Sequence, residues 1–338
     1  ERPMDSVSQA ALGAAVGGAV MGRQAGWRAF AIGAGVGTLP DLDSFISYGG
    51  AVADFTYHRG YTHALFVQTL AAPLIAWPLG RWRHRHGESH RRWLLTVWLI
   101  LITHALLDAV TIYGTQLWLP FSNYPVGLGS VFIIDPLYTL PLLIGIGAAA
   151  GNPWRRERWN QLGLALSTLY LAWAIGAQQV VEQRAAAAIE REGLAVERML
   201  VTPAPFSTLL WRVVAVGGEA HWEGFYTIGS GRTIEFNRYS NSPELLDGIE
   251  DTWAVQRLQY FTKGFYAVNE RDGSVIVTDL RMGQAGFYAF AFRVGTRRDG
   301  RTVARDDARY EYPRPPMTTV FRELYACGRG RPTEVIDC

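Results

Sequence analysis

The apolar residues of this chain are concentrated in its first half, and this distribution constrains the fold more than any other feature. The first half is almost continuously hydrophobic and the second is mixed and charged, so the mean hydropathy of the whole chain is only +0.04. A run of about 20 apolar residues can cross a bilayer as a helix, and shorter runs can do so when flanking residues extend them. The runs predict about six membrane helices, at 10–22, 27–39, 64–80, 93–113, 132–150 and 159–177.

The first two runs are the shortest, and a helix in a soluble core explains them equally well. They are rich in Gly and Ala, and Gly13 and Gly17 have the spacing that lets two helices approach closely. Tryptophans near the ends of the longer runs, including Trp93 and Trp159, fit the aromatic belt of a membrane interface.

Arginines are concentrated in alternate connections between the runs. The segments 23–28, 81–92 and 155–158 are arginine-rich, whereas 40–63 and 114–131 contain a single arginine between them. By the positive-inside rule the first three connections are cytoplasmic. The other two, and the chain beyond the sixth run, are then expected on the opposite, outer side of the membrane.

The second half predicts a soluble α+β domain on that outer side. A helical membrane domain at 4–177 is followed by a linker helix at 178–200 and the soluble domain at 201–338. Residues 243–262 have helical periodicity. Strands are expected at 208–216, 220–228, 233–239, 264–269, 274–280 and 286–294.

Overall charge and cysteine content say little about partners. With 32 basic and 30 acidic residues the net charge is +2, which gives no basis for a nucleic-acid partner. Cys327 and Cys338 form either a disulfide or two free thiols in a compartment that permits disulfides.

Imidazoles and carboxylates collect at the ends of the apolar runs, on the outer side. They are Asp41 and Asp43, His58 and His63, and the His104/Asp108 pair, whose members lie one helical turn apart. A carboxylate within a span costs about 2.5–3.5 kcal/mol, so Asp108 needs a compensating partner. That partner is either His104 itself, as a buried hydrogen-bonded pair, or a cation.

The cation interpretation predicts a zinc-type site with one or two divalent ions. The expected ligands are Asp41, His58, His63, His104 and Asp108, because imidazole nitrogens and carboxylate oxygens are ordinary zinc ligands. Asp43 would orient a ligating imidazole or act as general base, and the sequence does not decide between Asp41 and Asp43 as ligand. Arg59 would bind an anionic group of the substrate.

These motifs resemble the YdjM-type family of bacterial inner-membrane proteins, which are described as predicted metal-dependent hydrolases. The similarity covers roughly residues 4–150, and the second half resembles an extension found in one subgroup. It is carried by Met4–Gln9, Leu39–Asp43, His58–His63, His104–Asp108 and Thr111–Gln116. The family is distantly similar to zinc-dependent phospholipase C and the S1/P1 nucleases, which cleave phosphoesters. Many members have His where this chain has Gln9, so either one metal position is lost or Gln9 contacts the substrate.

The sequence and the resemblance together favour a membrane-embedded, metal-dependent hydrolase. The expected substrate is a phosphoester in a lipid or another amphiphile, and Asp43, Arg59 and Gln9 are the expected catalytic residues. The alternative is a non-catalytic membrane protein, either a transporter with a proton or cation relay or an assembly factor. Bound metal distinguishes the two, because a relay needs no stoichiometric transition metal.

Overall fold

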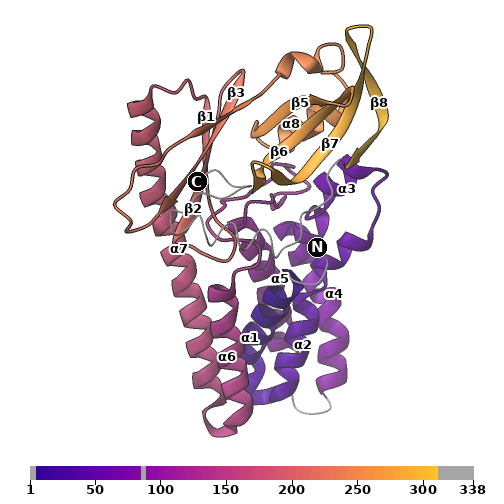
Figure 1. The fold of residues 1–338 in the computed structure, drawn as a ribbon. Helices are drawn as coiled ribbons and strands as arrows, with labels where there is room; N and C mark the ends of the chain where they lie inside the picture. The colour runs from indigo at the N-terminus through magenta and orange to yellow at the C-terminus, as the bar shows by residue number, and fades with distance from the viewer. Residues whose placement is uncertain (1–4, 85–88, 311–338) are drawn as a thin grey trace. The chain divides into compact units, whose positions relative to one another are not determined.

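The computed structural model describes residues 5–84 and 89–310, which form two compact units (Figure 1). The first unit contains the described chain up to Ile46 and the segment His58–Ile175. The second contains Ser47–Tyr57 and the described chain from Gly176 onward. The cysteines at 327 and 338 lie outside the described residues, so the disulfide stays a prediction.

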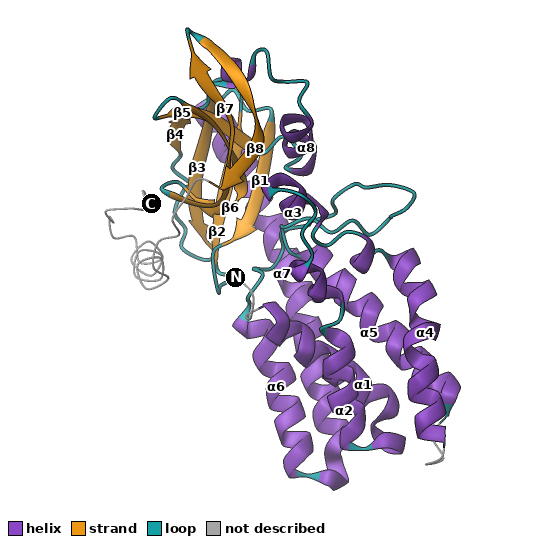
Figure 2. Cartoon of the chain, turned by 90° about the vertical axis from the view of Figure 1, so that its right-hand side faces the viewer, coloured by secondary structure: helices purple, strands orange, loops and turns teal. Residues whose placement is uncertain are grey.

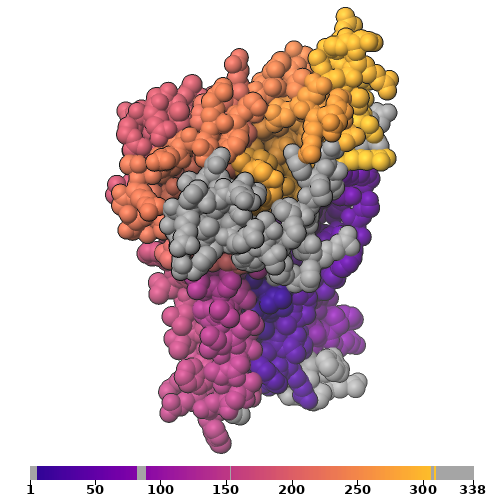
Figure 3. Space-filling model, in the orientation of Figure 1, coloured from indigo at the N-terminus to yellow at the C-terminus, as the bar shows by residue number. Residues whose placement is uncertain are grey.

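The first unit is a bundle of helices that run side by side (Figures 1 and 2). Its core is formed by α1, α4, α5 and α6, with buried side chains such as Leu12, Val97 and Leu142. Where α1, α6 and α7 come to the surface, their atoms pack without gaps between the helices (Figure 3). The elements are α1 (Asp5–Ala25), α2 (Trp27–Gly37), η1 (Pro40–Phe45), η2 (Tyr61–His63), α4 (Leu65–His84), α5 (His90–Val110), α6 (Pro136–Gly151), η3 (Pro153–Arg155) and the first part of α7 (Arg156–Glu192).

Glycines hold α1 and α2 in close contact. A Cβ atom on Gly13 would lie 2.3 Å from the carbonyl oxygen of Gly33, and one on Gly17 would lie 2.4 Å from that of Ala29. The backbones of the two helices therefore touch where a side chain would hold them apart. This contact places both helices beside α5, on which half of the site is built.

The expectation of about six membrane spans is not supported. Of the described helices, α5 and α7 are long and apolar enough to cross a bilayer, and a third span is obtained if the bent pair Ala51–His63 and Leu65–Arg81 counts as one. The 11 residues of α2 and the 16 of α6 extend only about 16 Å and 24 Å, against a hydrocarbon core of about 30 Å. The 21-residue α1 is long enough but too weakly apolar.

The expected linker helix is the continuation of α7, one of the candidate spans. α7 runs without a break from Arg156 to Glu192. From Gly176 onward α7 belongs to the second unit, where Val181 and Ala185 are buried against Val201, Trp211 and Val213.

The second unit contains two antiparallel four-stranded sheets, each in sequence order. Six strands fall near the predicted positions, and β1 and β8 were not predicted. Their bounds are β1 (Arg198–Pro203), β2 (Leu210–Val216), β3 (Ala220–Thr227), β4 (Asn237–Ser240), β5 (Tyr266–Arg271), β6 (Ser274–Gln284), β7 (Phe287–Arg298) and β8 (Arg301–Tyr310). The predicted helix at 243–262 is instead the short η4 (Pro243–Leu246) and, after a turn, α8 (Trp253–Phe261).

The segment Ser47–Tyr57, which carries α3 (Ala51–Tyr57), interrupts the first unit in sequence but belongs to the second. Phe55 is buried in an aromatic cluster, with ring centroids 5.0 Å from Phe261 and 4.5 Å from Phe290. The chain therefore leaves the helical unit directly after the Asp41/Asp43 segment and returns directly before His58.

Candidate metal site

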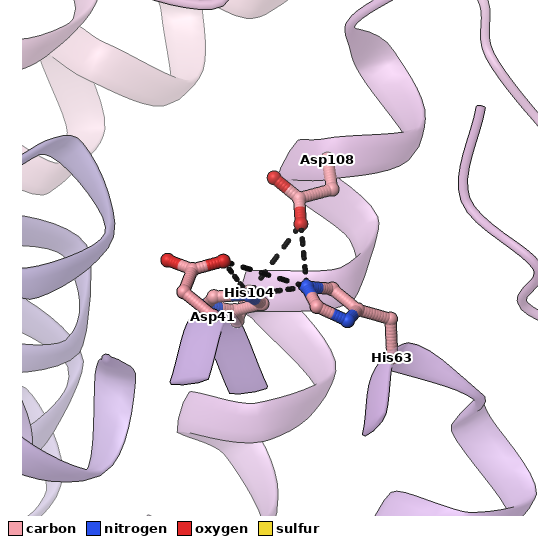
Figure 4. A group of neighbouring side chains, drawn as sticks. All are labelled: Asp41, His63, His104 and Asp108. Atoms are coloured by element: carbon pink, nitrogen blue, oxygen red, sulfur yellow. Dashed lines mark hydrogen bonds and ion pairs between the residues drawn. The ribbon is translucent and has the colours of Figure 1, made fainter. Parts of the chain in front are cut away.

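Four side chains from three elements of the helical unit converge on one point (Figure 4). Asp41 comes from η1, His63 from η2, and His104 and Asp108 from the end of α5. The Nε2 atoms of His63 and His104 are 3.1 Å apart. Asp108 Oδ2 lies 3.1 Å and 3.4 Å from these two atoms, and Asp41 Oδ1 lies 3.5 Å and 3.4 Å from them. One nitrogen or oxygen from each residue thus lies within 4.8 Å of all the others.

The end of α2 fixes the His104 ring. The last carbonyls of a helix have no partner within the helix, and the Gly37 carbonyl at the end of α2 accepts a hydrogen bond of 2.8 Å from His104 Nδ1. Because a carbonyl can only accept, the proton of neutral His104 is on Nδ1. The lone pair of Nε2 then points into the cluster.

Thr62 and Asp43 fix the His63 ring in the same way. The Thr62 hydroxyl donates to Asp43 Oδ2 over 2.6 Å, so its oxygen is left to accept from His63 Nδ1, 2.8 Å away. Neutral His63 therefore also presents the Nε2 lone pair to the cluster. In metal-binding histidines the ring nitrogen that faces away from the metal, here called the outer nitrogen, is typically hydrogen-bonded to a protein group in this way.

Two nitrogen lone pairs and two carboxylates that face one another repel unless a cation lies between them. Asp108 Oδ2, the oxygen that faces both imidazoles, accepts no hydrogen bond, and neither does the second oxygen of Asp41. Two imidazole nitrogens and two carboxylate oxygens are a ligand set that zinc-type divalent ions accept. The four residues therefore fit a metal ion. An imidazolium proton is the alternative cation.

The outer oxygen of Asp108 is held by Gln9 and Arg59. Gln9 donates from Nε2 to Asp108 Oδ1 over 2.8 Å, and Arg59 Nη2 lies 3.4 Å from the same oxygen. Arg59 is buried, donates from Nη1 to the Thr111 hydroxyl over 3.1 Å, and stacks on the Tyr113 ring. Two of the three predicted catalytic residues, Gln9 and Arg59, thus contact Asp108 from outside the cluster, and Gln9 is not among the four residues that converge.

Asp43 also lies outside the cluster. It accepts hydrogen bonds from His58 Nδ1 (2.8 Å), from the Arg59 backbone (3.1 Å) and from Thr62. Burial by itself raises the pKa of the Asp43 carboxyl, but the hydrogen bond from His58 and the nearby imidazole of His63 outweigh it and hold the pKa below its usual value. Asp43 is therefore an ionised acceptor that orients its neighbours.

His58, predicted as a ligand, is not brought to the other four. Its Nδ1 donates to Asp43, and its ring centroid is 6.3 Å from that of His63. The chain turns sharply at Arg59, which has a φ of 58°, so the residues before and after the turn face different neighbours. The spacing of the residues in the sequence did not predict this turn. It also did not predict that the Gly37 carbonyl would contact His104 or that Tyr113 would contact Arg59.

Asp41 is the part of the cluster that solvent reaches. Its side chain is 13% exposed, whereas the other three side chains are almost completely buried. Burial raises the pKa of the Asp41 carboxyl, but His104 and His63, when their rings are protonated, outweigh this by hydrogen bonding and hold its pKa well below the usual range. Asp41 is therefore ionised at neutral pH and marks the side from which the cluster is reached.

Comparison with known proteins places the chain in a family. It is 29% identical over 119 residues to the "Uncharacterized protein YfhP" of Bacillus subtilis (strain 168), a match that covers 34% of this chain and 35% of that protein. The chain thus spans about a third of the length of this curated relative. No solved structure matches. A family model described as YdjM inner membrane protein matches residues 4–181, which are more than half of the chain and include the whole cluster, so the chain belongs to the YdjM family of inner membrane proteins.

Proposed function

We propose that this chain is a membrane-embedded, metal-dependent hydrolase whose substrate is a phosphoester in a lipid or another amphiphile. The observation that carries the proposal is the convergence of Asp41, His63, His104 and Asp108, with the outer nitrogen of each histidine already hydrogen-bonded. A divalent ion at such a site supplies a Lewis acid for the phosphoryl oxygen and lowers the pKa of a water molecule to near neutrality.

The chain's own residues hold and orient this site. Gly37 and Thr62 keep both imidazoles turned inward. Gln9 and Arg59 hold the outer oxygen of Asp108, which leaves its inner oxygen toward the cluster. The guanidinium of Arg59 adds a buried positive charge beside the site, where it would favour an anionic substrate group.

The proposal places the site on the outer side of the inner membrane, together with the second unit. Asp108 lies at the last turn of α5, and the arginine pair Arg91 and Arg92 lies at the first turn of the same helix. The 21 residues of α5 separate the two ends by about 30 Å, which is the thickness of the hydrocarbon core. If the arginine end is cytoplasmic, the site is periplasmic.

The non-catalytic alternative, a proton or cation relay, is favoured only by the short His63–His104 contact, which could share a proton. A relay also needs ionisable groups that continue across the membrane. On α5 the buried residues between Trp93 and His104 are apolar except for Thr96, whose hydroxyl bonds to its own helix. The hydrolase is therefore the preferred function.

Activity measurements on matched variants test the proposal. The protein, purified in detergent without chelator, should hydrolyse a soluble phosphodiester or a short-chain phospholipid, lose this activity on chelation and regain it with zinc. Asp108→Asn should abolish activity. Asp135→Asn is the matched control, because Asp135 is a buried carboxylate of the same unit that caps α6, a position that Asn also occupies well. Hydrolysis that is insensitive to chelator and to Asp108→Asn, or no hydrolysis by the metal-loaded protein, would contradict the proposal.

A further inference from the structure

The connection between α5 and α6 is unusual because it carries no charge. From Thr111 to Ile134 the sequence contains no Asp, Glu, Lys, Arg or His. Connections that run through water are normally rich in polar and charged residues. This one instead contains Trp118, Phe121, Tyr124 and Leu128.

The connection is folded back on the end of α5, and its backbone is extensively hydrogen-bonded. The amides of Leu128 and Ser130 donate to the carbonyls of Ala109 and Val110, each over 2.9 Å. Thr115 and Val126 pair as an isolated β-bridge. Irregular backbone is tolerated at membrane depth only where its polar groups have protein partners, and these groups have them.

Four large apolar side chains of this connection are exposed, namely those of Trp118, Phe121, Tyr124 and Leu128. Phe121 is 77% exposed and Trp118 is 53% exposed. The Phe121 ring also meets Phe66, at the start of α4, with ring centroids 5.2 Å apart. Tryptophan and tyrosine are enriched at the boundary between lipid head groups and acyl chains. We call Trp118–Tyr124 the aromatic loop.

The aromatic loop is attached to the candidate site. The amide of Gln116 donates to the carbonyl of Arg59 over 3.0 Å, and the carbonyl of Leu117 accepts from the amide of Leu65 over 3.0 Å. Just before the loop, the Tyr113 ring stacks on the guanidinium of Arg59. The loop therefore lies at the same end of α5 as the cluster.

We propose that the aromatic loop is inserted into the membrane interface on the side of the site, with lipid as its occupant. Three features together favour lipid over water: the uncharged sequence, the hydrogen-bonded backbone and the position at the end of the candidate span α5. A second consequence rests on the proposed function. The loop would hold a lipid-resident substrate beside Arg59 and Asp41, with its head group at the cluster and its apolar part in the bilayer.

Spin-label accessibility tests the insertion without any assay of activity. In a Cys327→Ser/Cys338→Ser background, Phe121→Cys would be labelled with a nitroxide and the protein reconstituted into phosphatidylethanolamine/phosphatidylglycerol vesicles. Leu74→Cys is the lipid reference, because Leu74 lies within α4 and is also 77% exposed. Val303→Cys, on an exposed site of β8 in the second unit, is the reference for water.

The label at Phe121 should be accessible to oxygen, as at Leu74, and shielded from a water-soluble nickel complex relative to Val303. Nickel accessibility equal to that at Val303 would show a loop in water and overturn the proposal. Low accessibility to both reagents would show a loop covered by protein, which also overturns it. Neither accessibility measurement depends on hydrolysis. A negative result would therefore contradict the membrane insertion of the aromatic loop without contradicting the proposed function.

The substrate consequence is tested by the ratio of two activities. Trp118→Ser/Phe121→Ser should lower hydrolysis of a vesicle-resident phosphoester more than hydrolysis of a water-soluble one. Equal losses on both substrates would mean that the loop only supports the fold of the site.

Discussion

His58 and His63 carry the same imidazole and are separated by four residues, yet they have different neighbours. The Nε2 atom of His63 points into the cluster, and Nδ1 of His58 donates to Asp43. The difference is set by the backbone at Arg59, whose φ of 58° reverses the direction of the chain between them. The two histidines should therefore respond differently to substitution.

His63→Ala should lose metal, and His58→Ala should retain it. Loss of a ligand removes one of four bonds to the ion, whereas loss of a residue that orients the ligands typically costs about 10–100-fold in affinity. Competitive titration against a chromophoric chelator measures the zinc affinity of both variants. A His58→Ala protein that binds no zinc would show that His58 enters the ligand set when metal is bound.

His221, in the second unit, should make that unit sensitive to acid. Its Nε2 lies 3.2 Å from the Tyr288 hydroxyl, which donates to Glu223, so neutral His221 donates to the hydroxyl oxygen. Its Nδ1 is buried without a hydrogen-bond partner, so protonation there is unfavourable. Burial lowers the pKa of His221 to about 4, and the positive charge of Arg212 acts in the same direction.

Because this pKa lies below the unfolded value of 6.5, the unfolded chain binds more protons between the two values. The second unit should lose up to about 3 kcal/mol of stability as pH falls from 6.5 toward 4. His221→Gln, which cannot be protonated in this range, should remove that part of the pH dependence. Hydrogen exchange of peptides from β2 and β3, corrected for intrinsic exchange rates, measures the stability of the second unit at each pH. The same pH dependence in both proteins would contradict the assignment.

At the level of elements, the contact between α1 and α2 should matter for the site. A Cβ atom on Gly33 would lie 2.3 Å from the Gly13 carbonyl oxygen, whereas one on Gly35 would meet nothing within 4 Å. Gly33→Ala should destabilise the protein by about 1–3 kcal/mol through overpacking and weaken metal binding, because α2 supplies the Gly37 carbonyl and α1 supplies Gln9.

Gly35→Ala is the control for this prediction on the same helix. It should be neutral, or stabilising by up to about 1 kcal/mol through helix propensity. Thermal unfolding in detergent, combined with zinc titration, separates the two variants. Equal effects of the two substitutions would mean that the glycine contact does not position the site.

Sequence patterns predicted local features better than long-range ones. The i, i+4 spacing placed His104 and Asp108 on one buried face, and stretches rich in β-branched and aromatic residues predicted six of the described strands. The expectation of about six spans is not supported, because the apolar runs at 27–39 and 132–150 form helices, α2 and α6, that are too short to cross a bilayer. The position of His58 depends on a single positive φ angle, and the His104 tautomer depends on a carbonyl 67 residues away, so neither leaves a pattern in the sequence.

At the level of the whole molecule, the path of the chain predicts sidedness. The segment 81–92 should be cytoplasmic, and the second unit should be on the outer side. With Cys327 and Cys338 replaced by Ser, an impermeant maleimide should label Arg232→Cys in intact cells and Ser89→Cys only after permeabilisation. The reverse pattern would place the second unit in the cytoplasm and contradict the sidedness of the site.

The metal content of the purified protein tests the central claim most directly. The account predicts that wild-type protein isolated without chelator carries at least one zinc-type ion per chain, because two neutral imidazoles and two carboxylates face one point. His104→Ala, isolated in parallel, should carry less. Wild-type protein that is isolated without metal and binds no zinc on titration would contradict the account, and would leave the cluster as a set of imidazolium–carboxylate pairs.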